Sequence, residues 1–171
     1  ENVPFYGKRM NNNFSDMDRV NQIWRHPVYQ EHYKKIQELE SERIFCCHTP
    51  EHFLDVARLM YIYALEEHLE LPKELIYAAA LLHDIGRFSQ WTKNKSFNDE
   101  LLDHAQLGCA ILFSEGKIKD YDVQESDYEI IKKAILNHNK FKIDDDLTIR
   151  EKLHSKIIRD ATRKLKQDPH H

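Results

Sequence analysis

Glycine, proline and cysteine are all scarce in this sequence. Among 171 residues there are four glycines, five prolines and three cysteines. Because glycine and proline are the residues that most often interrupt helices, their scarcity leaves room for long helical segments. The cysteines include the adjacent pair Cys46 and Cys47, a spacing that makes neither a disulfide framework nor a zinc knuckle. We therefore expect free thiols and a location in the reducing cytoplasm.

Long apolar runs and an excess of basic charge are also missing. No apolar run approaches the roughly 20 residues that span a bilayer, and the segment from Glu1 to Tyr6 has no signal-peptide core. The net charge of −4 argues against a partner as large as a nucleic acid, whereas a local basic patch could still hold a small phosphorylated substrate. Hydrophobic residues make up 41% of the chain, which is enough for one core. We expect a single domain without membrane contact.

The spacing of apolar residues predicts helices throughout. Apolar side chains recur every three or four residues, and no segment alternates as a strand would. Helix starts are expected at Pro27, at Thr49–Pro50, after Leu71–Pro72, at Asn98 or Asp99, at the capping box Ser126–Glu129 and after Asp144–Asp146, with a polar loop over Gln90–Phe97. The expected fold is an all-α, single-domain bundle of roughly six or seven helices.

Three parts of the chain can be delimited. Residues 1–44 form an N-terminal extension with one or two helices, which would cover a pocket or form the contact of a homodimer. Residues 45–165 form the helical domain. Residues 166–171 form a tail in which His170 and His171 resemble a tag remnant, so these two are excluded as functional residues.

Ionisable side chains fall on the apolar faces of five expected helices. They are His52, His83, His104, His138 and Asp160, and Asp84 follows His83 directly. A lone histidine on an apolar face is more often a core residue bound to a backbone carbonyl, and Asp160 alone could pair with Arg159 or Lys164. Burying all of these groups separately would carry several desolvation costs, which one shared metal site removes. Because imidazole and carboxylate both bind divalent metals, the pattern favours a mononuclear or binuclear metal centre.

One motif points to a different class of enzyme. The segment from His48 to His52 reads H-x-x-E-H, the pattern of an inverted zinc-peptidase motif. That motif needs both histidines on one continuous helix. Because Pro50 is expected at the first helical position, His48 falls outside the helix. The peptidase interpretation is therefore disfavoured.

The order of these residues resembles a known superfamily. His52, His83–Asp84 and Asp160 follow the H…HD…D pattern of the HD-domain superfamily of metal-dependent phosphohydrolases, and the resemblance covers roughly residues 45–161. His104 and His138 fall where the binuclear branch carries two further histidines; that branch includes cyclic-dinucleotide phosphodiesterases and symmetrical diadenosine tetraphosphate hydrolases. After Asp160 the chain departs from the Asp-Ala-Asp-Lys-Leu-Asp run that such members often carry, which leaves Asp144–Asp146 as rival candidates.

The resemblance implies a chemistry and a set of ligands. It implies metal-dependent hydrolysis of a phosphate ester or anhydride in a nucleotide or similar small metabolite. One divalent metal (Fe, Mn, Zn, Co or Ni) would be held by His52, His83, Asp84 and Asp160, and a second by His104 and His138 with Asp84 as a bridge. Asp84 would also orient or deprotonate the attacking water, whose pKa a metal lowers toward roughly 7. Cations that could bind the phosphate are Arg87, Lys93, Lys95 and Lys140. The alternatives are a non-catalytic HD module that senses metal and nucleotide, and a purely structural helical domain.

Overall fold

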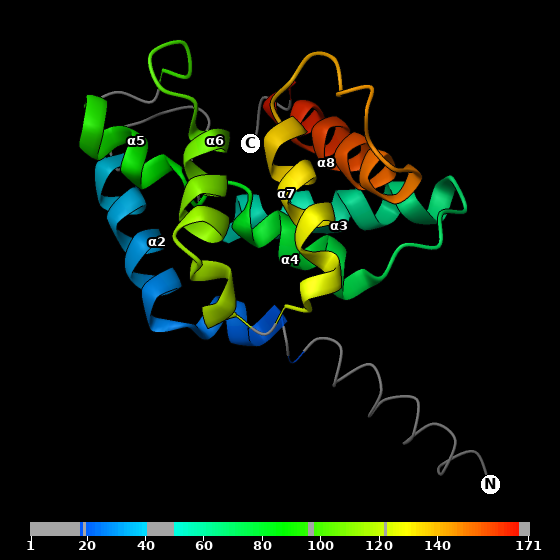
Figure 1. Ribbon diagram of the computed structural model, residues 1–171, viewed down its shortest axis with the longest axis horizontal. Coiled ribbons are helices and arrows are strands. Elements are labelled where there is room, and N and C mark those ends of the chain that lie inside the picture. Colours follow the sequence, from blue (N-terminus) through cyan, green and yellow to red (C-terminus); the bar gives the residue numbers. More distant parts are fainter. Residues whose placement is uncertain (1–17, 19, 41–49, 96–97, 122, 168–171) are drawn as a thin grey trace, which may run out of the picture.

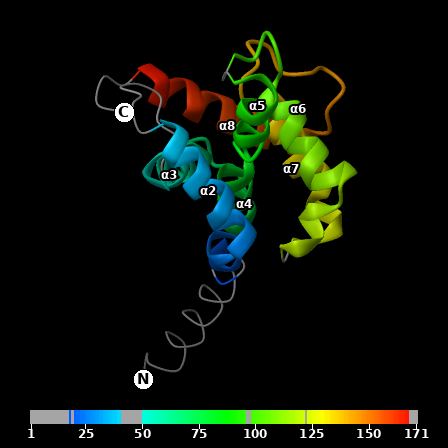
Figure 2. The same ribbon diagram turned by 90° about the vertical axis from the view of Figure 1, so that its left-hand side faces the viewer.

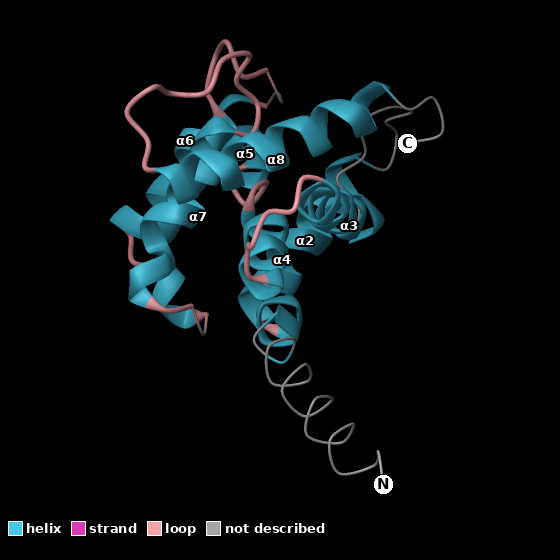
Figure 3. Cartoon of the chain, turned by 90° about the vertical axis from the view of Figure 1, so that its right-hand side faces the viewer, coloured by secondary structure: helices cyan, strands magenta, loops and turns pink. Residues whose placement is uncertain are grey.

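The computed structural model describes residues 18, 20–40, 50–95, 98–121 and 123–167. Within these ranges the chain forms helices, turns and loops, and no strand (Figure 3). The predicted all-α class is therefore confirmed. The expectations that involve Cys46, Cys47, His48 and Thr49 lie outside the described residues, as do those on the segment from Glu1 to Tyr6 and on His170 and His171.

Seven α-helices build the described part of the fold. They are α2 (Pro27–Glu40), α3 (Pro50–Glu66), α4 (Lys73–Leu82), α5 (Arg87–Asn94), α6 (His104–Cys109), α7 (Tyr128–Asn137) and α8 (Ile149–Gln167). Residues 20–25 are helical as well. Between α6 and α7 lie a π-helical turn, η1 (Ala110–Ser114), and two 3₁₀ turns, η2 (Lys117–Asp120) and η3 (Glu125–Asp127). None of the described helices is both long and apolar enough to cross a bilayer.

Helix α4 lies at the centre of the bundle, and its end carries the His83–Asp84 pair. It packs against α3 and α7, while α8 packs against both α3 and α7 (Figures 1 and 2). Seven of its ten residues are buried, three of them alanines, because helices approach it from several sides. A helix end at this depth places the side chains that follow it in the interior of the molecule.

Helix α2 belongs to the same core. Tyr29 and Tyr33 are buried and pack with Phe53 of α3 and Leu81 of α4. The hydroxyl of Tyr29 donates to the carbonyl oxygen of Leu81 over 2.5 Å. The described part of the N-terminal extension therefore forms one wall of the bundle beside the end of α4.

Two sequence expectations around α5 and α6 were wrong. The segment expected as a polar loop over Gln90–Phe97 is helical as far as Asn94, because Gly86 takes a helical conformation (φ −76°) and leads directly into α5. No helix starts at Asn98 or Asp99: those residues form a turn, and α6 begins only at His104, where Asp103 accepts a hydrogen bond from the amide of Ala105.

The expected capping box before α7 was also wrong. Ser126 lies inside the turn η3, and no side chain caps the start of α7 at Asp127. A capping box is instead present at α8. The hydroxyl of Thr148 accepts from the amide of Glu151 over 3.2 Å, and the Glu151 carboxylate accepts from the amide of Thr148 over 3.4 Å.

Gly86 allows α6 to approach the end of α4 closely. A Cβ atom at this position would overlap the carbonyl oxygen of His104 and lie 2.6 Å from the amide nitrogen of Gly108. Only glycine permits this backbone-to-backbone contact. The contact brings His104, the first residue of α6, next to Asp84.

Candidate metal centre

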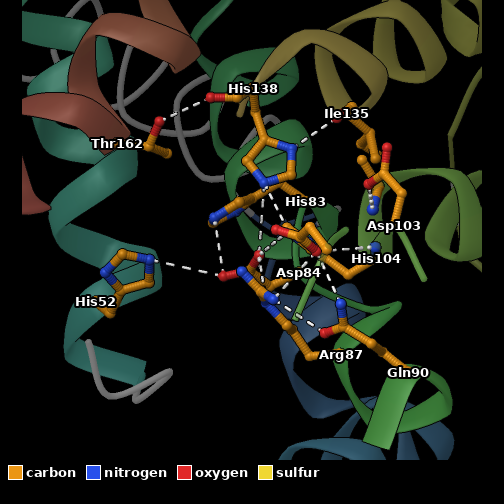
Figure 4. Close-up of polar contacts among 12 residues, drawn as sticks. His52, His83, Asp84, Arg87, Gln90, Asp103, His104, Ile135, His138 and Thr162 are labelled. Carbon is orange, nitrogen blue, oxygen red and sulfur yellow. Dashed lines mark hydrogen bonds and ion pairs between the residues drawn. The ribbon is translucent and has the colours of Figure 1, made fainter. Parts of the chain in front are cut away.

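The carboxylate of Asp84 lies between the imidazoles of four histidines (Figure 4). Its Oδ2 atom is 3.1 Å from Nε2 of His83 and 3.7 Å from Nε2 of His52. Its Oδ1 atom is 3.1 Å from Nε2 of His104 and 3.6 Å from Nε2 of His138. The side chain of Asp84 is only 3% exposed. Each carboxylate oxygen thus faces its own pair of imidazoles.

The four histidines come from four helices, at positions that the bundle brings together. His52 lies in the first turn of α3, and His104 is the first residue of α6. His83 and His138 directly follow α4 and α7. The structure therefore unites four of the helices that the sequence predicted to converge.

The Nδ1 atoms of three histidines are occupied by acceptors of the protein. Nδ1 of His83 lies 2.5 Å from the carbonyl oxygen of Ala80, and Nδ1 of His138 lies 2.6 Å from that of Ile135. Nδ1 of His104 lies 2.6 Å from Oδ1 of Asp99. Because a carbonyl or carboxylate oxygen only accepts, each Nδ1 carries the proton. In the neutral ring Nε2 then offers a lone pair toward Asp84, as metal-binding histidines require.

Asp99 is the functional neighbour that sequence reasoning missed. Its carboxylate also accepts from the amide of Gln90 over 2.8 Å and from the guanidinium of Arg87 over 3.4 Å. Gln90 is completely buried and accepts from Arg87 over 2.9 Å. Burial opposes the charge of Asp99, but the hydrogen bonds from His104 and the charge of Arg87 outweigh it and hold the pKa of Asp99 below its ordinary value. Asp99 therefore remains ionised and orients His104.

The electrostatics of the centre call for a cation. Burial, reinforced by the rings of His104 and His83, lowers the pKa of His138 to about 3, so its ring is neutral. Burial alone would lower the pKa of His104, but hydrogen bonds to Asp84 and Asp99 outweigh burial and raise it. Nε2 of His104 and Nε2 of His138 lie 2.9 Å apart, and both face Oδ1 of Asp84. Two imidazoles and a carboxylate that converge in this way suit a divalent metal ion.

Two triads in this cluster have metal-ligand geometry. One consists of His52, His83 and Asp84, and the other of Asp84, His104 and His138; in each triad the ligand atoms lie within 4.8 Å of one another. A third group with this spacing joins His104 to Asp99 and Asp103, which are only partly buried. The first two triads share Asp84, so the residues present suit one or two divalent ions.

Asp160 lies outside these triads. Its Oδ1 atom accepts hydrogen bonds from Nε and Nη2 of Arg159, over 3.2 and 3.1 Å. The rival carboxylate of Asp144 binds Lys140 over 2.9 Å, and Asp145 binds Lys142 over 3.2 Å. Asp144, Asp145 and Asp146 all lie outside the groups with metal-ligand spacing that the described residues form. The role of Asp160 as a ligand stays a prediction.

The predicted phosphate-binding cations occupy different surroundings. Arg87 is 8% exposed, and its guanidinium lies beneath the centre, with Nε 3.9 Å from Oδ1 of Asp84. Lys93 and Lys95 are exposed at the end of α5. Lys140 is half-exposed beside His138. Contact of any of the four with substrate stays a prediction, and the contacts of Arg87 suit a role in holding Asp84 and Asp99.

Comparison with known proteins gives one family. The model of the HD domain matches residues 49–168. The chain is also similar to an uncharacterized protein of Clostridium beijerinckii (strain ATCC 51743 / NCIMB 8052), with 36% identity over 126 residues that cover 74% of each chain. No solved structure matches the sequence. The match extends over most of the chain and includes His52, His83–Asp84, His104 and His138, so the protein belongs to the HD domain family.

Proposed function

We propose that the protein is a metal-dependent phosphohydrolase that cleaves a phosphate ester or anhydride in a nucleotide or a similar small phosphorylated metabolite. The observation that carries the proposal is the position of Asp84, whose two carboxylate oxygens each face a separate pair of imidazoles. Membership of the HD domain family supports the same chemistry.

The ligands divide into two sets. His52 and His83 would hold one divalent ion with Oδ2 of Asp84, and His104 and His138 a second with Oδ1. When bound, such ions lower the pKa of a coordinated water and neutralise charge on a phosphoryl oxygen. Ligands made only of nitrogen and oxygen, rich in imidazole, suit Fe, Mn, Zn, Co or Ni better than Mg. Asp160 is the proposed further ligand of the first ion.

The chain's own residues prepare the site for this reaction. Three oxygen acceptors fix the proton on Nδ1 of His83, His138 and His104. They are the carbonyls of Ala80 and Ile135 and the carboxylate of Asp99. Side chains held in this way do not reorganise when charge develops during the reaction. Arg87, held by Gln90 and Asp99, keeps a positive charge near Oδ1 of Asp84. We propose that Asp84 orients the attacking water.

The test compares two isosteric substitutions. Asp84→Asn keeps the shape of the side chain but removes the shared charge, whereas Asp145→Asn changes a carboxylate that is 83% exposed. Both variants are loaded with each candidate metal and assayed on a panel of phosphate esters and nucleotides. We expect Asp84→Asn to lose at least about a hundredfold in kcat/KM and Asp145→Asn to match the parent protein.

Two outcomes would contradict the proposal. Full activity of Asp84→Asn would exclude the shared carboxylate from the reaction. Metal binding without turnover of any phosphate compound would favour the alternative, a sensor module that binds metal and nucleotide.

A further inference from the structure

A basic pocket adjoins the metal centre at the end of α7. It lies between the segment that follows α7 and the last turns of α8, and its lining is His138, Asn139, Lys140, Arg159, Thr162, Arg163 and Lys166. His138 belongs to both the pocket and the cluster around Asp84. Thr162 links α8 to the segment after α7, because its hydroxyl donates to the carbonyl oxygen of His138 over 3.0 Å.

The pocket is positively charged in a chain whose net charge is negative. Four of its lining residues are cations, while the whole protein carries a net charge of −4. Lys140 is neutralised by Asp144 and Arg159 by Asp160. Arg163 and Lys166 have no carboxylate partner among the described residues. Two positive charges therefore remain at one wall of the pocket.

Contacts of the basic side chains with the carbonyl groups after α7 explain only part of their arrangement. Basic side chains often stabilise the carbonyl groups at a helix C-terminus. Arg163 does contact the carbonyl oxygens of Phe141 and Lys140, through Nη2 alone and over 3.3 and 3.5 Å. Its guanidinium also lies over the ring of Phe141, 5.7 Å from the centroid. A guanidinium has five N–H donors, so Arg163 is held in place with donors to spare for an anion.

We infer that this pocket binds a second phosphate group of the substrate, beyond the one that reacts at the metal centre. The class of substrate is then a compound with at least two linked phosphates, such as a nucleoside diphosphate, rather than a monophosphate. Arg163 and Lys166 would be the residues that determine this specificity. The inference rests on the proposed function, because that function places the reacting phosphate beside His138.

The first measurement needs no turnover. Binding of inorganic pyrophosphate and of inorganic phosphate is measured by calorimetry on the full chain, for the parent protein, Arg163→Gln, Lys166→Gln and the control Lys164→Gln. Lys164 is exposed on the same helix but does not line the pocket. Removing one cation that binds the phosphate should weaken pyrophosphate binding about tenfold. Lys164→Gln should bind pyrophosphate as the parent does, and Arg163→Lys should recover part of the affinity.

The second measurement is the ratio of kcat/KM for a nucleoside diphosphate to that for the matching monophosphate. We expect Arg163→Gln and Lys166→Gln to lower this ratio about tenfold and Lys164→Gln to leave it unchanged. An unchanged ratio in a catalytically active protein would overturn the inference and leave the proposed function standing. If no phosphate compound is turned over, the proposed function fails, but the calorimetry still tests the inference. Equal pyrophosphate affinity in all three glutamine variants would show that Arg163 and Lys166 do not bind a phosphate group.

Discussion

Oδ1 of Asp99 lies 2.6 Å from Nδ1 of His104, and this contact fixes which nitrogen of the His104 ring faces Asp84. The same carboxylate accepts from the backbone amide of His104 over 3.2 Å. Asp99 therefore acts on the metal centre through His104 without touching Asp84. The buried amide of Gln90 holds Asp99 from the other side.

Replacing Asp99 should lower the affinity for the metal ion that His104 and His138 are proposed to hold. Asp99→Asn removes the charge that keeps the proton on Nδ1, and the loss of such a partner typically lowers metal affinity about 10- to 100-fold. Metal affinity is measured by competition with a chelator, with Glu100→Gln, an exposed neighbouring carboxylate, as the control. If Asp99→Asn bound metal as tightly as Glu100→Gln does, Asp99 would have no positioning role. The melting temperatures of the metal-free variants separate this effect from misfolding.

Gly86→Ala should destabilise the protein because the new methyl group has no space. Its Cβ would overlap the backbone of His104 and lie 2.6 Å from the amide of Gly108, and overpacking of this kind costs about 3 kcal/mol. Gly116→Ala is the comparison, because a Cβ there meets nothing within 4 Å. This variant carries only the backbone strain of φ +76°, which costs about 1 kcal/mol. Denaturant unfolding measures both. Equal losses in the two variants would contradict a close approach at Gly86.

His154 should make the stability of the protein depend on pH. This side chain on α8 is completely buried, and neither ring nitrogen has a hydrogen-bond partner among the described residues. Burial, with a smaller contribution from Arg150, lowers the pKa of His154 from 6.5 to about 4. The unfolded chain then binds more protons than the folded one between these two values, so the free energy of unfolding falls as the pH drops below 6.5. The loss from His154 alone should reach about 2 kcal/mol at pH 5.

The check is the difference in unfolding free energy between pH 7.5 and pH 5. We expect His154→Leu to reduce this difference by about 2 kcal/mol, while His68→Asn, at an exposed histidine, leaves it as in the parent. A difference that persists in full in His154→Leu would show that other groups cause the pH dependence.

The histidines of the centre could be singled out as candidates because each falls on the apolar repeat of an expected helix, where an unsatisfied polar group is costly. In the structure His83 and His138 directly follow α4 and α7, and His104 begins α6. Asp99 could not be located in this way, because it lies in a turn before α6 and on no helical face. The path of that turn brings its carboxylate to Nδ1 of His104. In the same turn Leu101 is 66% exposed.

Local signals at the helix starts were less decisive than tertiary packing. The Ser126–Glu129 sequence has the residues of a capping box, yet a 3₁₀ turn occupies that place. The box at Thr148–Glu151 forms at the start of α8, where Glu151 is buried against the bundle. A four-residue motif is compatible with either outcome, and the surrounding contacts select one.

Elemental analysis of the purified, metal-loaded protein tests the central claim most directly. The parent protein should hold about two divalent ions per chain, shared through Asp84, and Asp84→Asn should lose most of both. Asp145→Asn should keep the full content. Absence of stoichiometric metal from the parent protein, or an unchanged metal content in Asp84→Asn, would contradict a metal centre built around this carboxylate.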